Sequence, residues 1–86
     1  MENVLELGSV VKLKATGLEL TVIGYYPIDE KSGETYDYLC VNHFLGTVKD
    51  EDMIAINEIA IDSVVFHGYR NEEAEEVLKL VAEYEK

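Results

Sequence analysis

The chain begins with two short segments in which apolar and polar residues alternate. In residues 8–14 (GSVVKLK) and residues 18–26 (LELTVIGYY), every second position is apolar, as at Val11 and Leu20. Alternation with a period of two is typical of a strand with one buried face. Because residues 15–17 (ATG) form a short turn signal between the two segments, the pattern predicts a β-hairpin.

Two further strands are expected. Residues 35–44 (TYDYLCVNHF) are rich in aromatic and β-branched residues and predict a third strand, and residues 64–69 (VVFHGY) predict a last one. The pattern between them, in residues 47–63, is weaker. It predicts a short strand around Met53–Ile56 or, instead, a single helical turn capped by Asn57 or by Asp62.

The chain ends with a predicted amphipathic helix. Asn71 is a suitable N-cap, and the carboxylates that follow it favour the positive end of a helix dipole. The helix is expected to end at about Tyr84 or Glu85. Its apolar residues recur at steps of three and four, which predicts a stripe that covers the open face of the sheet; they are Ala74, Val77, Leu78, Val81 and Tyr84.

The order of strands first and one helix last, with short connections, predicts an α+β fold. We expect a single domain over residues 1–86, in which a small antiparallel sheet of four or five strands curls towards a barrel beside one C-terminal helix. The chain is 48% hydrophobic, which is enough for a small core. It has one cysteine, so no internal disulfide can form, and stability must come from packing.

Charge and hydropathy narrow the classes of partner. Seven Lys and Arg against eighteen Asp and Glu give a net charge of −11, which repels nucleic acid and anionic membranes. The chain has no apolar run long enough to span a membrane, and Met1-Glu2-Asn3 does not resemble the start of a signal peptide. We therefore expect a cytoplasmic protein that binds neither nucleic acid nor membrane.

The stretch ETYDYLCVNHFLG (34–46) carries the cysteine and one of the two histidines. In a regular strand, Cys40 and His43 point to opposite faces and cannot form a nucleophile–base pair. A free cysteine also packs well as a small apolar side chain, so we expect Cys40 in the core. The sequence contains no phosphate-binding glycine loop and no zinc-ligand spacing, and we expect no enzyme, cofactor or metal site.

Aromatic residues offer a different kind of site. A small sheet with one helix has a second face, on which tyrosines can form an exposed aromatic surface suited to a protein partner. The residues considered for it are Tyr25, Tyr26, Tyr36, Tyr38 and Tyr69. On the helix, Leu80 lies off the apolar stripe, and with Tyr84 it offers a second docking surface.

The chain resembles a bacterial family described as domain of unknown function 4176. The resemblance runs from Gly8 to about Leu78 and is most specific at Tyr36-Asp37-Tyr38 and at residues 61–69 (IDSVVFHGY). After Tyr-Asp-Tyr the family often has a Pro-Glu-Gly turn, whereas this chain has NHFLGTVKDEDM, so contacts made by that loop do not carry over.

The resemblance implies a gene neighbourhood for the protein and no established activity. Genes of the family tend to lie in Gram-positive bacteria beside type VII secretion components and LXG-type toxins. This implies a non-enzymatic accessory or targeting factor that binds a secreted toxin or its small helical companions. The alternative is an acidic immunity protein that occludes a toxin's active site. The oligomeric state stays open, a homodimer included. The residues expected to contact a partner are Tyr36, Tyr38, Phe66, Tyr69, Leu80 and Tyr84.

Overall fold

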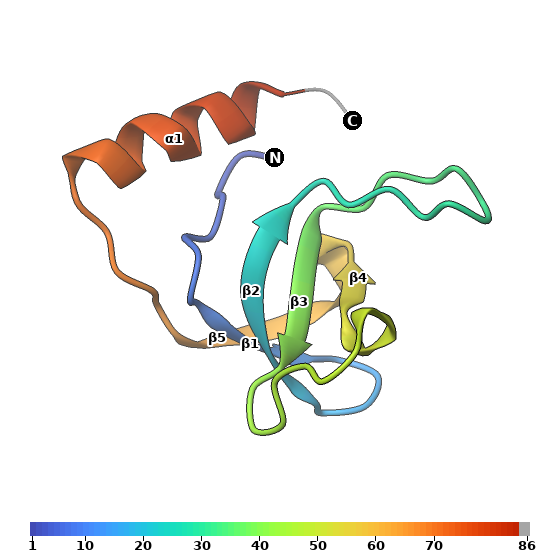
Figure 1. Cartoon of the computed structure of the whole chain (residues 1–86). Helices are drawn as coiled ribbons and strands as arrows, with labels where there is room; N and C mark the ends of the chain where they lie inside the picture. Colours follow the sequence, from blue (N-terminus) through green and yellow to red (C-terminus); the bar gives the residue numbers. More distant parts are fainter. Residues whose placement is uncertain (85–86) are drawn as a thin grey trace.

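The computed structural model describes residues 1–84 and contains one antiparallel sheet and one long helix (Figure 1). The five strands lie side by side in the order β4-β3-β2-β1-β5. Their bounds are β1 Val10–Leu13, β2 Glu19–Tyr25, β3 Tyr38–Asn42, β4 Ile54–Ile56 and β5 Ile61–Phe66. The helix α1 spans Glu72–Glu83, and two 3-10 turns, η1 Asp50–Asp52 and η2 Glu58–Ala60, precede β4 and β5. This arrangement confirms the α+β prediction.

The first two strands form the predicted hairpin. β1 pairs with β2 in a register that sets Val11 opposite Leu20, and both side chains are fully buried. Gly17 closes the turn with a φ of +72°, a conformation that glycine adopts without the steric cost of a Cβ. Both strands are shorter than expected: β1 begins two residues later and ends one residue earlier than residues 8–14, and β2 is one residue shorter at each end than residues 18–26.

The third strand is also shorter than residues 35–44. β2 and β3 pair only from Tyr25 and Tyr38 inwards. Tyr26 takes a φ of +52° directly after β2, which turns the chain out of the sheet. The loop from Tyr26 to Asp37 then leaves the sheet as an arm, held by an isolated bridge between Ile28 and Thr35.

Residues 47–63, where the sequence pattern is weak, contain the predicted short strand, which is β4. Of the two proposed caps for a helical turn, Asn57 directly precedes η2, whereas Asp62 lies inside β5. β5 begins three residues before the predicted 64 and ends before Gly68. β4 and β5 are the two edges of the sheet, so the sheet is not closed into a barrel.

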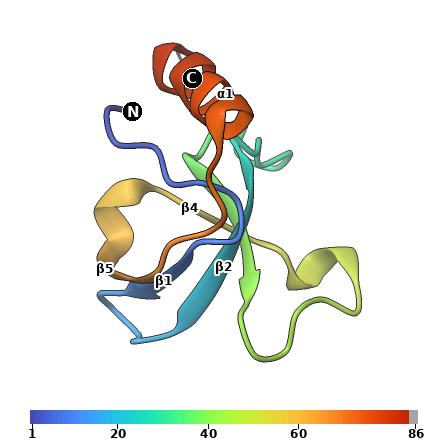
Figure 2. The same ribbon diagram turned by 90° about the vertical axis from the view of Figure 1, so that its left-hand side faces the viewer.

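The helix begins where the sequence predicted. The Asn71 side chain accepts a hydrogen bond from the backbone N–H of Ala74 at 2.9 Å, and α1 ends at Glu83 with Tyr84 as its C-cap. Glu85, the other end point considered, lies outside the described residues. Figures 1 and 2 show α1 across one end of the sheet, beside the N-terminal segment (residues 1–9), not flat on a sheet face as expected.

One cluster of buried side chains joins the sheet, the N-terminal segment and the helix. Leu78 is the buried residue of α1 (72–83) and packs into this cluster. The cluster consists of Val4, Val11, Leu20, Val22, Tyr38, Cys40, Ile56 and Leu78. Because Val4 and Leu78 both belong to it, the two ends of the chain are stabilised by the same core.

Candidate functional site

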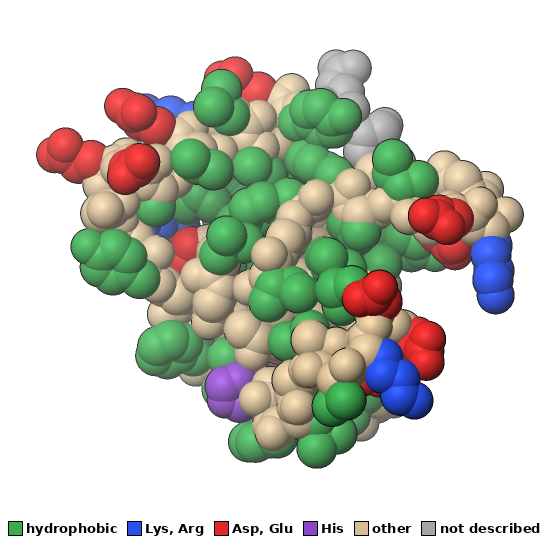
Figure 3. All heavy atoms as spheres, viewed as in Figure 1, with side chains coloured by type: hydrophobic (Ala, Val, Ile, Leu, Met, Phe, Trp, Pro, Cys, Tyr) green, Lys and Arg blue, Asp and Glu red, His purple; other side chains and the backbone are tan. Residues whose placement is uncertain are grey.

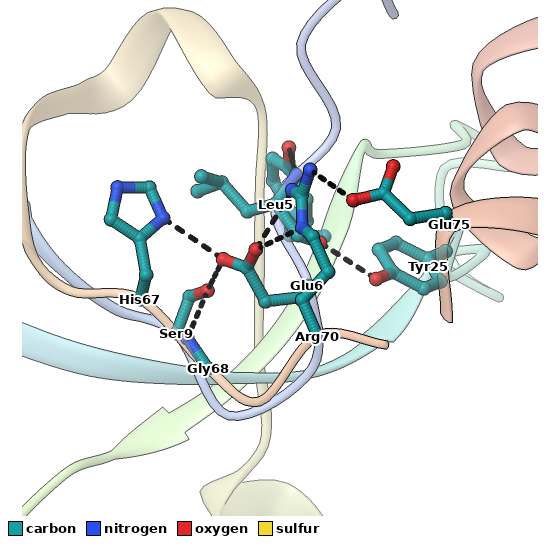
Figure 4. A network of polar contacts seen from close by, with 9 residues as sticks. Leu5, Glu6, Ser9, Tyr25, His67, Gly68, Arg70 and Glu75 are labelled. Atoms are coloured by element: carbon teal, nitrogen blue, oxygen red, sulfur yellow. Dashed lines mark hydrogen bonds and ion pairs between the residues drawn. The ribbon is translucent and has the colours of Figure 1, made fainter. Parts of the chain in front are cut away.

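A buried carboxylate ties the N-terminal segment to the segment that leads into α1 (Figure 4). Glu6 is almost fully buried, and its Oε1 accepts hydrogen bonds from Ser9 Oγ at 2.5 Å and from His67 Nδ1 at 3.0 Å. Its Oε2 lies 2.8 Å from both Nε and Nη2 of Arg70. Arg70 also contacts Glu75 of α1 at 3.2 Å. We call Glu6, Ser9, His67 and Arg70 the Glu6 cluster.

The cluster holds Glu6 in its charged form. Burial raises the pKa of Glu6, but the hydrogen bonds from Ser9, His67 and Arg70 together outweigh burial and bring the pKa from 4.5 down to about 2. The carboxylate is therefore ionised at neutral pH. An ionised carboxylate only accepts hydrogen bonds, so Nδ1 of His67 is the donor in its contact with Glu6.

The two segments approach each other too closely for any side chain at Gly68. A Cβ built there would lie 2.1 Å from the carbonyl oxygen of Leu7. The backbone N–H of Gly68 also donates to Ser9 Oγ at 3.0 Å. Close packing at Gly68 and the bonds to Glu6 therefore fix the chain just before α1.

The Glu6 cluster contains a serine, a histidine and an acid, but not in the order of a hydrolytic triad. In a triad the histidine contacts the serine and takes its proton. Here Ser9 Oγ and His67 Nδ1 both donate hydrogen bonds to the same oxygen of Glu6, and Ser9 is fully buried. This geometry fits a structural connection between the segments.

Beside the cluster, a groove runs between α1 and the end of β2. It has a volume of about 450 Å³. Its apolar lining is Leu7, Tyr25, Tyr69, Ala74, Val77 and Leu78, and its polar lining is Glu6, Asn71 and Glu73. Figure 3 shows hydrophobic side chains gathered between α1 and the sheet, beside the carboxylates at the start of the helix. We call this surface the α1 groove.

Three apolar side chains of the α1 groove are open to solvent. Leu7 is 51% exposed, Tyr69 is 81% exposed and Val77 is 48% exposed. Tyr25 lies deeper, and its hydroxyl donates to the carbonyl oxygen of Leu5 at 2.6 Å. Burial and the nearby charge of Glu6 raise the pKa of Tyr25, so its hydroxyl stays protonated. Exposed apolar side chains that share one groove are typical of a binding surface.

The expectation that Tyr38 lies on an exposed aromatic surface is wrong. Its side chain is 1% exposed and belongs to the core, and its hydroxyl accepts a hydrogen bond from the backbone N–H of Leu5 at 3.0 Å. Burial raises the pKa of Tyr38 to about 12. Tyr38 and Cys40 lie two residues apart along β3 and share one face of the strand, and that face is the core.

The other predicted contact residues lie apart from one another. Tyr69 is in the α1 groove, whereas Phe66 is exposed on β5 and lines a second apolar surface with Phe44 and Val65. Tyr36 lies at the base of the 26–37 arm. The structure therefore divides these residues among several surfaces.

The last two predicted residues, Leu80 and Tyr84, lie at the far end of α1, outside the lining of the groove. Tyr26 anchors this end. Its hydroxyl donates to the carbonyl oxygen of Val81 at 2.6 Å, and its ring lies 4.9 Å from that of Tyr84. Leu80 and Tyr84 are exposed, and their role stays a prediction.

Residues 34–46, which include Cys40 and His43, contain β3 and the loop residues on either side of it. Cys40 is fully buried, as predicted, and burial raises the pKa of its thiol to about 12. His43 is exposed and contacts Thr21 Oγ1 at 2.9 Å. Asp37 accepts a hydrogen bond from the backbone N–H of Glu58 at 2.8 Å.

Two kinds of feature are absent from residues 1–84, the part of the chain that the structure describes. No group of three or more His, Cys, Asp and Glu side chains in this range is placed to hold a metal ion. No helix in the same range is both long and apolar enough to cross a lipid bilayer.

Sequence reasoning missed the contribution of the N-terminal segment. Leu7 and Glu6 both line the α1 groove, and Glu6 also bonds Arg70. No helix or strand was expected in residues 1–7. The available signal was three apolar residues, Val4, Leu5 and Leu7, within one short segment. Their spacing does not mark a buried side, because Val4 and Leu5 point to opposite sides of an extended chain and the residues that the structure buries are Val4 and Glu6.

Comparison with known proteins gives a family but no activity. No curated protein and no solved structure matches the chain. A family model described as a domain of unknown function (DUF4176) matches residues 4–77, a range that includes Glu6, Tyr69 and Val77. The chain therefore belongs to the DUF4176 family.

Proposed function

We propose that this protein is a non-enzymatic interaction module that binds a protein partner through the α1 groove. The observation that carries the proposal is the exposure of Leu7, Tyr69 and Val77 in one groove. Apolar and aromatic side chains that lose contact with water on binding supply most of the affinity of protein interfaces.

The groove is held firmly enough to act as a docking surface. The Glu6 cluster fixes the chain on both sides of Tyr69, and Leu78 attaches α1 to the core. A surface that is already ordered before binding loses less conformational entropy when a partner docks. This favours recognition by a largely preformed site.

For the partner, we propose a secreted LXG-type toxin or one of its small helical companions. The support is membership of the DUF4176 family, together with the setting that the sequence resemblance implies. In this proposal the protein acts in the cytoplasm of a Gram-positive bacterium as an accessory or targeting factor for type VII secretion cargo.

The test is a tagged pull-down from the native host, with bound proteins identified by mass spectrometry. At about 0.5 M salt, exposed charges are screened beyond a few ångströms, so apolar docking survives while purely ionic capture is lost. We expect an LXG-type toxin or its helical companion to be recovered at this salt. Recovery of neither protein at high or low salt would contradict the proposal.

A second candidate function is suggested by the acidic start of α1. Glu72, Glu73, Glu75 and Glu76 are all exposed within the first turns of the helix. An immunity protein can use such carboxylates to occlude a basic active site. A toxin captured only at low salt, and lost on replacing these glutamates by glutamine, would favour this function.

A further inference from the structure

We propose that the occupant of the α1 groove is a cationic amphipathic α-helix. Its apolar side chains would contact Leu7, Tyr69 and Val77, and its Lys or Arg side chains would face the carboxylates at the start of α1. This inference rests on the proposed function and deepens it, because it specifies the chemistry of the partner segment.

The charges around the α1 groove favour a positively charged partner. The charged residues that line the groove are Glu6 and Glu73, both acidic. Glu6 is already paired with Arg70, which also faces Glu75, so Glu73 is the lining carboxylate that forms no ion pair among residues 1–84. Glu72 and Glu76 are exposed in the same part of α1, and Lys79 contributes to a different hollow, beside Glu2 and Ala82. A partner with positive side chains at the groove's rim is attracted, and an acidic partner is repelled.

The backbone around the groove favours a helix over an extended strand. Tyr25 belongs to β2, an inner strand of the sheet, and neither edge strand, β4 or β5, contributes a residue to the groove lining. Val77 belongs to α1, whose backbone is bonded within the helix. These elements offer a partner side chains but no open sheet edge. A helix satisfies its own backbone groups and is the form that can bury an apolar face there without losing hydrogen bonds.

The size and depth of the groove agree with this occupant. A volume of about 450 Å³ next to three exposed apolar side chains accommodates a few large side chains, not a folded domain. An amphipathic helix presents such side chains at steps of three and four residues along one stripe. Its other face stays in water, as a shallow groove requires.

The test uses designed peptides as probes and the full chain as the receptor. The first peptide is a short helix of Leu and Lys, and the second has the same Leu positions with Glu in place of Lys. Binding is measured by calorimetry at about 0.15 M and about 0.5 M salt, and the site is mapped by amide chemical shifts. We expect the Leu/Lys helix to bind at least about tenfold more tightly, a difference of about 1.4 kcal/mol, and to shift the amides around Tyr69 and Val77.

Matched variants separate groove binding from general attraction to an acidic protein. Val77→Asp should weaken binding of the Leu/Lys helix at least about tenfold, whereas Ile59→Asp, at an exposed apolar residue of η2, should change it less than about twofold. Glu73→Lys, inside the groove lining, should weaken binding more than Glu30→Lys, which changes the net charge equally but lies on the 26–37 arm, outside the groove lining. Equal effects within either pair would overturn the inference.

The remaining outcomes distinguish this inference from the proposed function. Recovery of the toxin together with failure of the Leu/Lys helix to bind would overturn the helix inference but leave the interaction role intact. Groove binding of the peptide without any toxin in the pull-down would contradict the proposed partner alone. Self-association of the wild-type chain in sedimentation, lost in Val77→Asp, would show that a second copy fills the groove and would also overturn the inference.

Discussion

Glu6 shows how one buried charge organises the region around the groove. It accepts hydrogen bonds from three side chains that lie 3, 61 and 64 residues away along the chain. A buried carboxylate is stabilising only when such donors compensate for its lost hydration. The N-terminal segment and the segment before α1 are therefore coupled through a single side chain.

Replacing Glu6 by glutamine should destabilise the fold. Glu6→Gln keeps the size of the side chain but removes the charge that strengthens these bonds, at a cost of about 2–3 kcal/mol in the free energy of unfolding. Urea denaturation measures this difference. Glu75→Gln, which removes the solvent-exposed partner of Arg70, serves as the control and should change stability little. Equal losses in the two variants would contradict a structural role for Glu6.

The same residue predicts a dependence of stability on pH. Its pKa is about 2 in the folded protein against 4.5 ordinarily, so the folded state binds this proton less readily than the unfolded state. The stabilisation is fully present above pH 4.5 and is lost as the pH falls through about 2. The difference in unfolding free energy between wild type and Glu6→Gln should shrink over that range. A difference that stays constant would contradict the depressed pKa.

A substitution at Gly68 tests how closely the N-terminal segment approaches the segment before α1. Gly68→Ala would place a methyl group against the Leu7 carbonyl and should cost at least about 2 kcal/mol in stability. Gly24→Ala is the control, since its Cβ would meet only the Leu39 side chain at 3.5 Å, an ordinary contact. Thermal unfolding of both variants provides the measurement, and a Gly68→Ala protein as stable as Gly24→Ala would be the contrary result.

At the scale of elements, Leu78 is the buried side chain through which α1 joins the core. Leu78→Ala should lower the unfolding free energy by about 2–4 kcal/mol, because it leaves a cavity in the core. Leu80→Ala, two residues further along the same helix and exposed, should change it by less than about 0.5 kcal/mol. Denaturant unfolding compares the two variants. Similar losses would mean that α1 does not attach through Leu78.

The elements themselves could largely be predicted, because their signals are local. Alternation around Val11 and Leu20 predicted the hairpin, and Asn71 with its following carboxylates predicted the start of α1. The bounds of β5 were wrong, since most of this edge strand is exposed and it pairs with β1 through two register shifts. Such a strand lacks the regular pattern of buried positions on which the prediction depended.

The sequence could not predict which face of β3 is buried or where α1 lies against the sheet. Alternation along β3 groups Tyr38 with Cys40, but period two does not say which group faces the core. The apolar stripe of α1 predicts a buried side without naming what covers it. Its position beside the N-terminal segment depends on contacts such as Glu6 to Arg70, which join distant residues and leave no periodic signal.

At the scale of the whole molecule, the site is assembled from three parts of the chain. Leu7 comes from the N-terminal segment, Tyr25 from the end of β2, and Tyr69 and Val77 from the C-terminal region. The sequence singled out Tyr69 and treated Tyr25 as one of a group of tyrosines. It did not predict the groove, because a surface formed by tertiary packing exists only once these parts are brought together.

The measurement that tests the central claim most directly is quantitative recovery of the toxin or its companion from the native host by two matched variants at about 0.5 M salt. Tyr69→Ala removes an 81% exposed aromatic side chain from the α1 groove, and Phe44→Ala removes a 74% exposed one from a different surface. We predict that Tyr69→Ala loses most of the partner, whereas Phe44→Ala recovers as much as wild type. Full recovery by Tyr69→Ala, with the protein folded, would contradict the claim that this groove is where the protein binds its partner.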